Sequence, residues 1–346
     1  MALYNIKKIN LVVIYLCIYF FTGLGAAYAQ DETRRYVLLI VGLGGSQEYR
    51  EKFHKYLYET RKNLIEKFQF SENNIIVLAD SRSEEENFIN EISTAENIKA
   101  QFSYLSKKVT DKDDIYIFLF GHGSFDGKNA MLNIPRRDLK DADYAELVQT
   151  FNARRIIFIN TTSCSAPFIT HLSAPGRIII TATKSGTERN ETIFPKFLIE
   201  AMNSSASDKD KNGDLSVLEV FQYASERTAR WYEESNHLAT EHPLLEDTGD
   251  KSAYRAEELI DYAEGSLSSI TYLLERTRAV ATAMASTGDS VFAKLFLEQK
   301  KINQEISLLK AEKTKYTERD YFAKLESFFI RLAKISDEIE KYEKLH

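Results

Sequence analysis

Five short apolar runs are spaced along the first part of the chain, and each one ends at glycine or polar residues. They cover residues 36–41, 75–78, 115–120, 156–159 and 177–182. The apolar positions within each run are continuous rather than alternating, which is typical of strands buried on both faces of a parallel sheet. The pattern therefore predicts five buried strands.

The segments between these runs have the spacing of amphipathic helices, with apolar residues three or four positions apart. Helices are predicted over residues 48–68, 98–109, 143–151 and 193–202. Ser93 to Glu96 form a capping-box sequence that marks the start of the second helix. Strands alternating with helices predict an α/β fold with a doubly wound, mainly parallel sheet flanked by helices, and we place this domain at residues 34–250.

Residues 253–346 have a different pattern, with no proline and no predicted strand. Apolar residues recur at helical spacing in two stripes, at Leu259, Ala263, Leu267, Ile270 and Leu274, and at Leu295, Ile302, Ile306 and Leu309. A heptad seam follows at Tyr321, Leu325, Phe328, Leu332, Ile335, Ile339 and Tyr342. We predict an all-α module, a helical hairpin or coiled coil. It packs on the sheet domain, contacts a partner protein or self-associates, and the first of these is favoured.

The first 29 residues have the features of a cleaved secretory signal. Lys7 and Lys8 precede an apolar run over residues 9–21, and Ala27-Tyr28-Ala29 has the small-x-small pattern that signal peptidase cuts. The alternative is a retained membrane anchor, which the run disfavours because it is shorter than the ~20 residues that a span needs. We therefore expect an exported protein, periplasmic or secreted, with no membrane span after cleavage.

Charge and cysteine content narrow the choice of partners. The whole chain has a net charge of −6, and loss of two lysines with the signal makes it −8, which argues against nucleic acid or an anionic membrane as a partner. Cleavage also removes Cys17, so Cys164 is left without a disulfide partner in an oxidising compartment. Such a thiol is either reactive or a small buried apolar group.

No organic cofactor is expected. The glycine-rich segment after the first predicted strand, Gly42-Leu43-Gly44-Gly45, has neither the spacing of a dinucleotide-binding loop nor the lysine of a P-loop.

Candidate chemistry gathers at the ends of the third and fourth predicted strands. His122 and Gly123 follow the third strand, and Ser163 and Cys164 follow the fourth. A right-handed crossover between parallel strands places both carboxyl ends at the same edge of the sheet, where sites form in open α/β folds. An imidazole can activate a thiol, and the amide of Gly123 could stabilise an oxyanion. This arrangement predicts acyl transfer from a peptide or amide.

A second candidate site is a stretch of 12 residues rich in aspartate. It has the EF-hand pattern, with oxygen ligands at Asp208, Asp210, Asn212, Asp214, Ser216 and Glu219, and with Gly213 at the sharp turn. The match predicts calcium. The alternative is a solvated, aspartate-rich turn, and no second loop pairs with this one.

Residues 36 to about 245 resemble the caspase-fold cysteine peptidases, most closely the legumain and GPI-transamidase branch. The resemblance rests on the segments YVLLIVGLGG, Tyr49-Arg50, NIIVLAD, His122-Gly123-Ser124 and TTSCSAPF. It implies a caspase-like sheet, His122 as the catalytic base, a cysteine nucleophile at the end of the fourth strand, and a role for Arg50 in binding the residue before the cleaved bond.

The nucleophile position departs from the family pattern by one residue. Alignment on Ser165 puts Ser163 in the place of the cysteine, whereas Cys164 fits only with a one-residue shift. Successive side chains of an extended chain point to opposite sides, so only one of the two can face His122. The remaining histidines have no comparable partner in the sequence and are expected to be surface or structural: His54, His171, His237 and His242.

Two functions follow from different classes. The first is an exported cysteine peptidase or transpeptidase that acts on a polypeptide through Cys164 and His122. The second is a catalytically degenerate peptidase fold that binds or scaffolds a protein partner through its helical module. A weaker variant uses Ser163 with His122, but a serine without an orienting acid is poorly activated.

Overall fold

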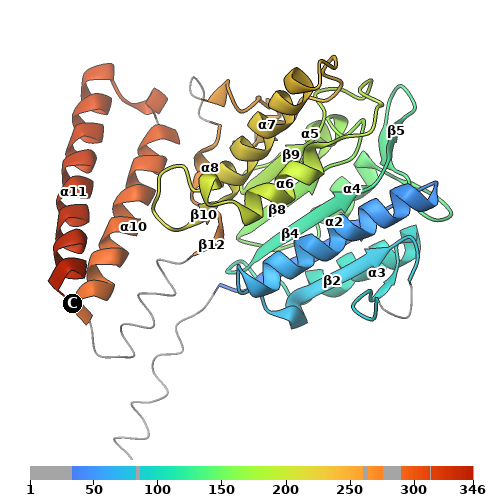
Figure 1. Cartoon of the computed structure of the whole chain (residues 1–346), viewed down its shortest axis with the longest axis horizontal. Helices are drawn as coiled ribbons and strands as arrows, with labels where there is room; N and C mark the ends of the chain where they lie inside the picture. The colour runs from blue at the N-terminus through green and yellow to red at the C-terminus, as the bar shows by residue number, and fades with distance from the viewer. Residues whose placement is uncertain (1–32, 83–85, 260–263, 276–289, 312, 346) are drawn as a thin grey trace, which may run out of the picture. The chain divides into compact units, whose positions relative to one another are not determined.

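A seven-stranded, mostly parallel sheet is the centre of this computed structural model, which describes residues 33–82, 86–259, 264–275, 290–311 and 313–345 (Figure 1). The spatial order is β11-β9-β8-β4-β1-β2-β3, and only β11 is antiparallel to its neighbour. The strands are β1 (Arg35–Val41), β2 (Ile75–Ala79), β3 (Glu91–Ile92), β4 (Asp114–Phe120), β8 (Arg155–Asn160), β9 (Arg177–Thr181) and β11 (Leu244–Glu246). All five predicted strands are confirmed, whereas β3 and β11 are too short to give an apolar pattern.

Helices cover both faces of the sheet (Figure 1). They are α2 (Gln47–Glu66), α3 (Ala95–Ser106), α4 (Asp141–Val148), α5 (Pro167–Leu172), α6 (Phe194–Asn203) and α7 (Val217–Glu234). Helices α2, α6 and α7 pack on the face that includes Val37 and Leu39, and α3, α4 and α5 pack on the face that includes Leu38 and Ile40. Because both faces are buried, the strands read as unbroken apolar runs in the sequence.

The register of β4 and β8 fixes the edge where the candidate residues emerge. Phe118 is paired with Ile159 and Leu119 with Asn160, in parallel. The predicted adjacency of these two strands is confirmed. His122 and Ser163 follow the carboxyl ends of these two strands and therefore lie at the same edge of the sheet.

The segment between β4 and α4 contains a small antiparallel sheet that the sequence did not predict. Its strands are β5 (Gly123–Phe125), β6 (Ala130–Leu132) and β7 (Leu139–Lys140). The β5–β6 turn is closed by Asp126, whose Oδ1 accepts hydrogen bonds from the amides of Lys128 and Asn129. Strands of two or three residues carry no periodic signal, so this segment reads in the sequence as a polar linker.

The predicted helical stripe from Leu259 to Leu274 is wrong. From residue 264 onward, the described part of this region contains one α-helical turn, α8 (Ser266–Ser269), and then a strand, β12 (Tyr272–Leu274), which pairs antiparallel with β10 (Leu215–Ser216). Backbone pairing with a distant strand outweighs the local helical spacing here. Ala263 and the predicted signal over residues 1–29 lie outside the described residues.

The last two helices, α10 (Ser290–Ala311) and α11 (Glu318–Leu345), form an antiparallel hairpin (Figure 1). Phe292 stacks on Tyr342 near one end, and Arg331 forms ion pairs with Glu298 and Glu305 further along. The predicted heptad seam is the inner side of α11, where its residues are buried or half-buried. No helix within the described ranges is long and apolar enough to cross a membrane. Short 3-10 turns complete the fold at Glu72–Asn74, Ser205–Ser207 and Lys313–Lys315.

Candidate functional site

His122 is held at the carboxyl end of β4 by aromatic side chains of α2. Its ring makes edge contacts with Tyr49 and Phe53, at centroid distances of 4.6 and 5.0 Å. Burial lowers the pKa of His122; a hydrogen bond with the Gly44 backbone opposes this shift, and the charge of Lys52 adds to it. The imidazole is therefore neutral at neutral pH, the form that a general base requires.

Ser163 lies directly against the residue that follows the histidine. Its hydroxyl accepts a hydrogen bond from the Gly123 amide at 3.1 Å and donates one to the Gly123 carbonyl at 3.0 Å. The approach is so close that a Cβ atom on Gly123 would lie 2.0 Å from the Ser163 carbonyl oxygen. The amide expected to stabilise an oxyanion is therefore already bound to the Ser163 hydroxyl.

Cys164 is turned into the interior of the protein. Its side chain is 1% exposed, its φ is +56°, and its amide donates to the Glu188 carbonyl at 2.9 Å. Burial raises the pKa of the thiol, with a smaller lowering by Arg189 and a raising by Glu188. Among the described residues, no hydrogen bond joins Cys164 to His122. The buried thiol is therefore protonated, whereas nucleophilic attack requires the thiolate.

Arg50 faces a network that the sequence did not reveal. Its Nε lies 3.4 Å from Oδ2 of the buried Asp80, which ends β2. His54 joins Asp80 at 2.8 Å through Nε2 and Glu86 at 2.6 Å through Nδ1. His54 is thus a satisfied structural histidine, as expected. Its partners lie 26 and 32 residues away along the chain, too far for spacing to indicate them.

His242 is linked to the Cys164 segment through Glu188. Its Nδ1 lies 2.5 Å from Glu188 Oε1, and the backbone carbonyl of the same glutamate accepts the Cys164 amide hydrogen bond. The histidine expected to partner Cys164 was His122, but His242 is the one connected to it through this chain of contacts.

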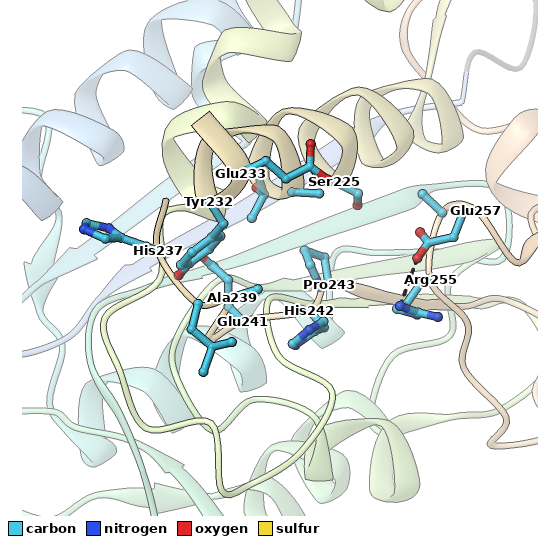
Figure 2. Close-up of a pocket in the computed structure, with 14 residues that line it drawn as sticks. Ser225, Tyr232, Glu233, His237, Ala239, Glu241, His242, Pro243, Arg255 and Glu257 are labelled. Atoms are coloured by element: carbon cyan, nitrogen blue, oxygen red, sulfur yellow. Dashed lines mark hydrogen bonds and ion pairs between the residues drawn. The ribbon is translucent and has the colours of Figure 1, made fainter. Parts of the chain in front are cut away.

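A pocket of about 420 Å³ opens beside His242, between α7 and the loops at 237–243 and 255–257 (Figure 2). Burial raises the pKa of Glu241 to about 7, although the amides of Ile193 and Phe194 donate to its carboxylate. The hydroxyls of Ser225 and Thr228 are buried and lack hydrogen-bond partners among the described residues. Ser225 and Thr228 thus line the pocket, but their hydroxyl oxygens are themselves buried. The residues of the pocket are too scattered along the sequence to form a motif.

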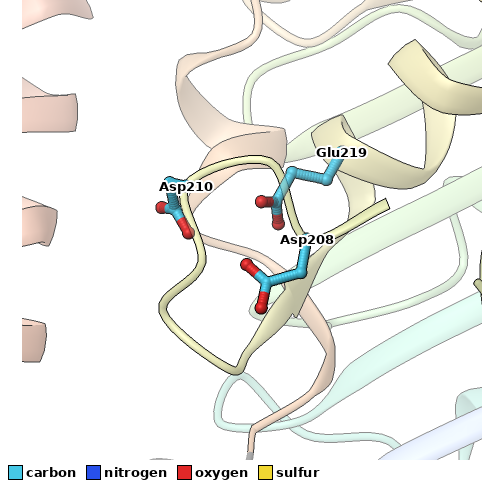
Figure 3. Close-up of side chains that lie close together, drawn as sticks. All are labelled: Asp208, Asp210 and Glu219. Carbon is cyan, nitrogen blue, oxygen red and sulfur yellow. The ribbon is translucent and has the colours of Figure 1, made fainter. Parts of the chain in front are cut away.

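The aspartate-rich stretch folds into a loop whose acidic side chains converge. We call residues 208–219 the metal loop. One oxygen each from Asp208, Asp210 and Glu219 lies within 4.8 Å of the others (Figure 3). Asp210 is an exposed residue, but desolvation of its carboxylate within the loop, together with the charges of Glu219 and Asp208, raises its pKa to about 6. Three of the predicted ligands are therefore placed so that they could hold a metal ion.

The metal loop is held in shape by its own side chains. Asp208 accepts hydrogen bonds from the amides of Asn212 and Gly213, and Asn212 Oδ1 accepts one from the Asp214 amide. Gly213 has a φ of +80°, which allows the sharp turn. Glu219 accepts from the amides of Lys209 and Ser216 while it occupies the first turn of α7. The loop is thus preorganised by local contacts.

The pairing of β10 with β12 gives the metal loop a backbone partner. Leu215, at loop position 8, is paired with Leu274. A second loop of the same kind, absent from the sequence, is therefore not needed to complete this strand pair.

No protein-family model matches this chain, and no curated protein is similar enough to it to count as a match. The function proposed below therefore rests on the geometry of the sheet edge, the pocket and the metal loop.

Proposed function

We propose that this chain is an exported binding protein, built on a peptidase-like sheet, in which Cys164 does not act as a nucleophile. The export signal expected at residues 1–29 is part of the proposal. This is the second of the two functions predicted from the sequence, a catalytically degenerate peptidase fold that binds a protein partner. The protein partner is bound through the pocket beside α7 and through the hairpin of α10 and α11.

The observation that carries the proposal is the burial of the only described cysteine. A catalytic thiol must reach both a base and a substrate carbonyl, but the Cys164 side chain is 1% exposed and makes no hydrogen bond with His122 among the described residues. The Ser163 hydroxyl lies nearer the histidine segment, but both of its hydrogen bonds go to Gly123. Within the described ranges, no acidic side chain forms a hydrogen bond that would orient His122. Neither residue is arranged as an activated nucleophile.

The outer surface of the hairpin supports a binding role. Six large apolar side chains are exposed on its two helices: Val291, Leu297, Leu308, Phe322, Phe329 and Ile330. Exposed apolar side chains that gather on one module are typical of a surface that contacts another protein. The hairpin seam is already occupied by α10, so these residues are available to a partner.

We further propose that the metal loop binds calcium. Its ligands are carboxylate oxygens, which calcium prefers, and their spacing follows the EF-hand order. The ion would replace the mutual repulsion of Asp208, Asp210 and Glu219 with attraction, and so stabilise the start of α7.

Alkylation of the native protein by iodoacetamide tests the absence of a nucleophile. Cys164 should react at least ~100-fold more slowly than in urea, because the reagent reaches the thiol only through local opening. His122→Ala should leave the rate unchanged. Rapid alkylation that falls with His122→Ala, or cleavage of a peptide library that is lost in Cys164→Ala, would restore the peptidase function.

Photo-crosslinking from the hairpin tests the binding surface. A photoreactive residue at Phe329 should link to a partner protein, whereas the same residue at the exposed, polar Glu338 of α11 should not. If crosslinks form only between copies of this chain, the hairpin is a self-association surface. If crosslinking is equal from both positions, the surface around Phe329 is not a specific binding site.

A further inference from the structure

A second group of acidic side chains lies where the antiparallel edge strand β11 ends. One oxygen each from Glu246, Asp250 and Glu264 lies within 4.8 Å of the others. Glu246 and Glu264 are buried, and Asp250 is exposed. We call these three residues the β11 cluster. It shares no residue with the metal loop, the sheet edge or the pocket.

One carboxylate oxygen of the β11 cluster is buried without a well-formed hydrogen bond from the part of the chain that the structure describes. Glu246 is 0% exposed, and its Oε1 accepts hydrogen bonds from the amides of Gly249 and Asp250. Its Oε2 is buried as well and has no hydrogen-bond partner of ordinary geometry among the described residues, although the Ser173 hydroxyl lies close enough to the carboxylate to oppose the rise in its pKa that burial causes. Leaving a buried carboxylate oxygen unpaired is costly, and such oxygens are normally paired or bound to a metal.

The surroundings of the β11 cluster add further negative charge. The Glu264 carboxylate accepts hydrogen bonds from the Asp247 amide and the Thr248 hydroxyl, both at 2.7 Å. Asp247 is itself buried, and its carboxylate accepts from the amides of Gly265 and Ser268. No lysine, arginine or histidine in the described part of the chain forms an ion pair with Glu246, Asp247 or Glu264. Three buried acids therefore share one small region without an ion pair to any basic side chain of the described residues.

We propose that Glu246, Asp250 and Glu264 bind a calcium ion. Calcium–oxygen distances are about 2.3–2.6 Å, so two ligands on opposite sides of the ion lie up to ~5 Å apart. The three oxygens lie within 4.8 Å of one another, so a single calcium ion can reach all of them. Magnesium would require stricter, near-octahedral geometry. The cluster contains neither cysteine nor histidine, which disfavours zinc.

The position of the β11 cluster suggests what the ion would do. Glu264 directly precedes the turn into α8, and α8 leads to β12, which pairs with β10 of the metal loop. A cation at the β11 cluster would tie the start of this segment to the edge of the main sheet, while the metal loop holds its other end. Two ions would therefore fix the segment between Glu264 and Leu274 at both ends.

Calcium titration of the full chain tests this site separately from the metal loop. Asp210→Asn together with Glu219→Gln removes the metal loop, and calorimetry should still detect one calcium ion per chain. In that background Glu246→Gln should abolish binding, because the amide keeps the shape and removes the charge. Asp250→Asn should weaken it by at least ~10-fold.

Asp111→Asn is the matched control, since it removes one exposed aspartate outside both clusters and should leave calcium affinity unchanged. If Glu246→Gln does not fold, the exposed position of Asp250 lets Asp250→Asn decide alone. The proposal is overturned if the variant without the metal loop binds no calcium, if binding survives Asp250→Asn at full affinity, or if magnesium binds more tightly than calcium.

Discussion

The metal loop and the sheet edge are assembled over very different lengths of chain. In the metal loop, 12 consecutive residues supply every predicted ligand, and three acidic oxygens lie within 4.8 Å of one another. At the sheet edge, the candidate residues come from α2 and from the ends of β4 and β8. In the local site, three of the six predicted ligands converge, whereas among the described residues the long-range site forms no hydrogen bond between its thiol and its imidazole.

The cause of this difference is the distance along the sequence between the residues whose contacts decide each orientation. Asp208 and Asn212 shape the metal loop through hydrogen bonds to their near neighbours. The orientation of Cys164, by contrast, depends on its left-handed backbone and on the carbonyl of Glu188. Ser163 and Cys164 are both buried, so burial does not distinguish them. The contact that fixes the orientation of Cys164 comes from a segment 24 residues downstream, which the local spacing of residues does not indicate.

The largest expected effect comes from Gly123→Ala, which tests how tightly the sheet edge is packed. The added Cβ would lie 2.0 Å from the Ser163 carbonyl oxygen, so the two strand ends would have to separate. We expect a loss of about 3 kcal/mol or more in the free energy of unfolding, measured by urea denaturation.

Gly45→Ala is the control for this substitution. Gly45 has a φ of +74° and no atom within 4 Å of its missing Cβ, so alanine there introduces only backbone strain of about 1–2 kcal/mol. Equal losses for the two variants would mean that the close approach of β4 and β8 is not a rigid feature of the sheet edge.

The same contrast explains how much of the fold the sequence predicted. Strands such as β4 and β8 are buried on both faces, so their apolar runs are unambiguous. Strand β12 has three residues, and it exists because β10 offers it a backbone partner, which overrides the helical spacing around Leu267 and Leu274. The pocket beside α7 and the β11 cluster were missed because their residues meet only after folding.

Calcium removal is expected to have the next largest effect and concerns the metal loop. At a free calcium concentration of 100 times the dissociation constant, binding to one site stabilises the folded state by about 2.7 kcal/mol. For a domain of this size the change corresponds to a rise of about 5–10 °C in Tm. Differential scanning fluorimetry should show this shift with calcium, and Asp210→Asn with Glu219→Gln should reduce it. An unchanged Tm on addition of calcium would mean that the metal loop does not bind the ion.

Substitution of Cys164 has a smaller effect and tests whether the thiol is an apolar core group. Serine would bury a hydroxyl at a 1% exposed position and should cost about 2 kcal/mol, whereas alanine should cost about 1 kcal/mol. Both values are measurable by urea denaturation. A functional nucleophile predicts the reverse pattern, with little effect on stability and complete loss of an activity in both variants.

The smallest expected effect is the pH dependence of the stabilisation by His54. It tests whether the sheet edge and the metal loop titrate over different pH ranges. Burial alone would lower the pKa of His54, but the hydrogen bonds to Asp80 and Glu86 outweigh it and raise the pKa. The stabilisation by His54 is therefore complete below the unfolded pKa of about 6.5 and is lost as the pH rises through the folded pKa. His54→Gln should cost about 1 kcal/mol more at pH 5.5 than at pH 9.

The metal loop should respond over a lower pH range. The pKa of Asp210 is raised to about 6, so its protonated form stabilises the folded state in the absence of calcium. This stabilisation is lost as the pH rises from about 4 to 6. Urea denaturation of His54→Gln and of Asp210→Asn in the presence of EDTA, at intervals from pH 4 to pH 9, should therefore give two separate transitions in the stability difference from wild type. Coincident transitions would mean that the sheet edge and the metal loop titrate as one coupled unit, and the contrast between a local and a long-range site would not hold.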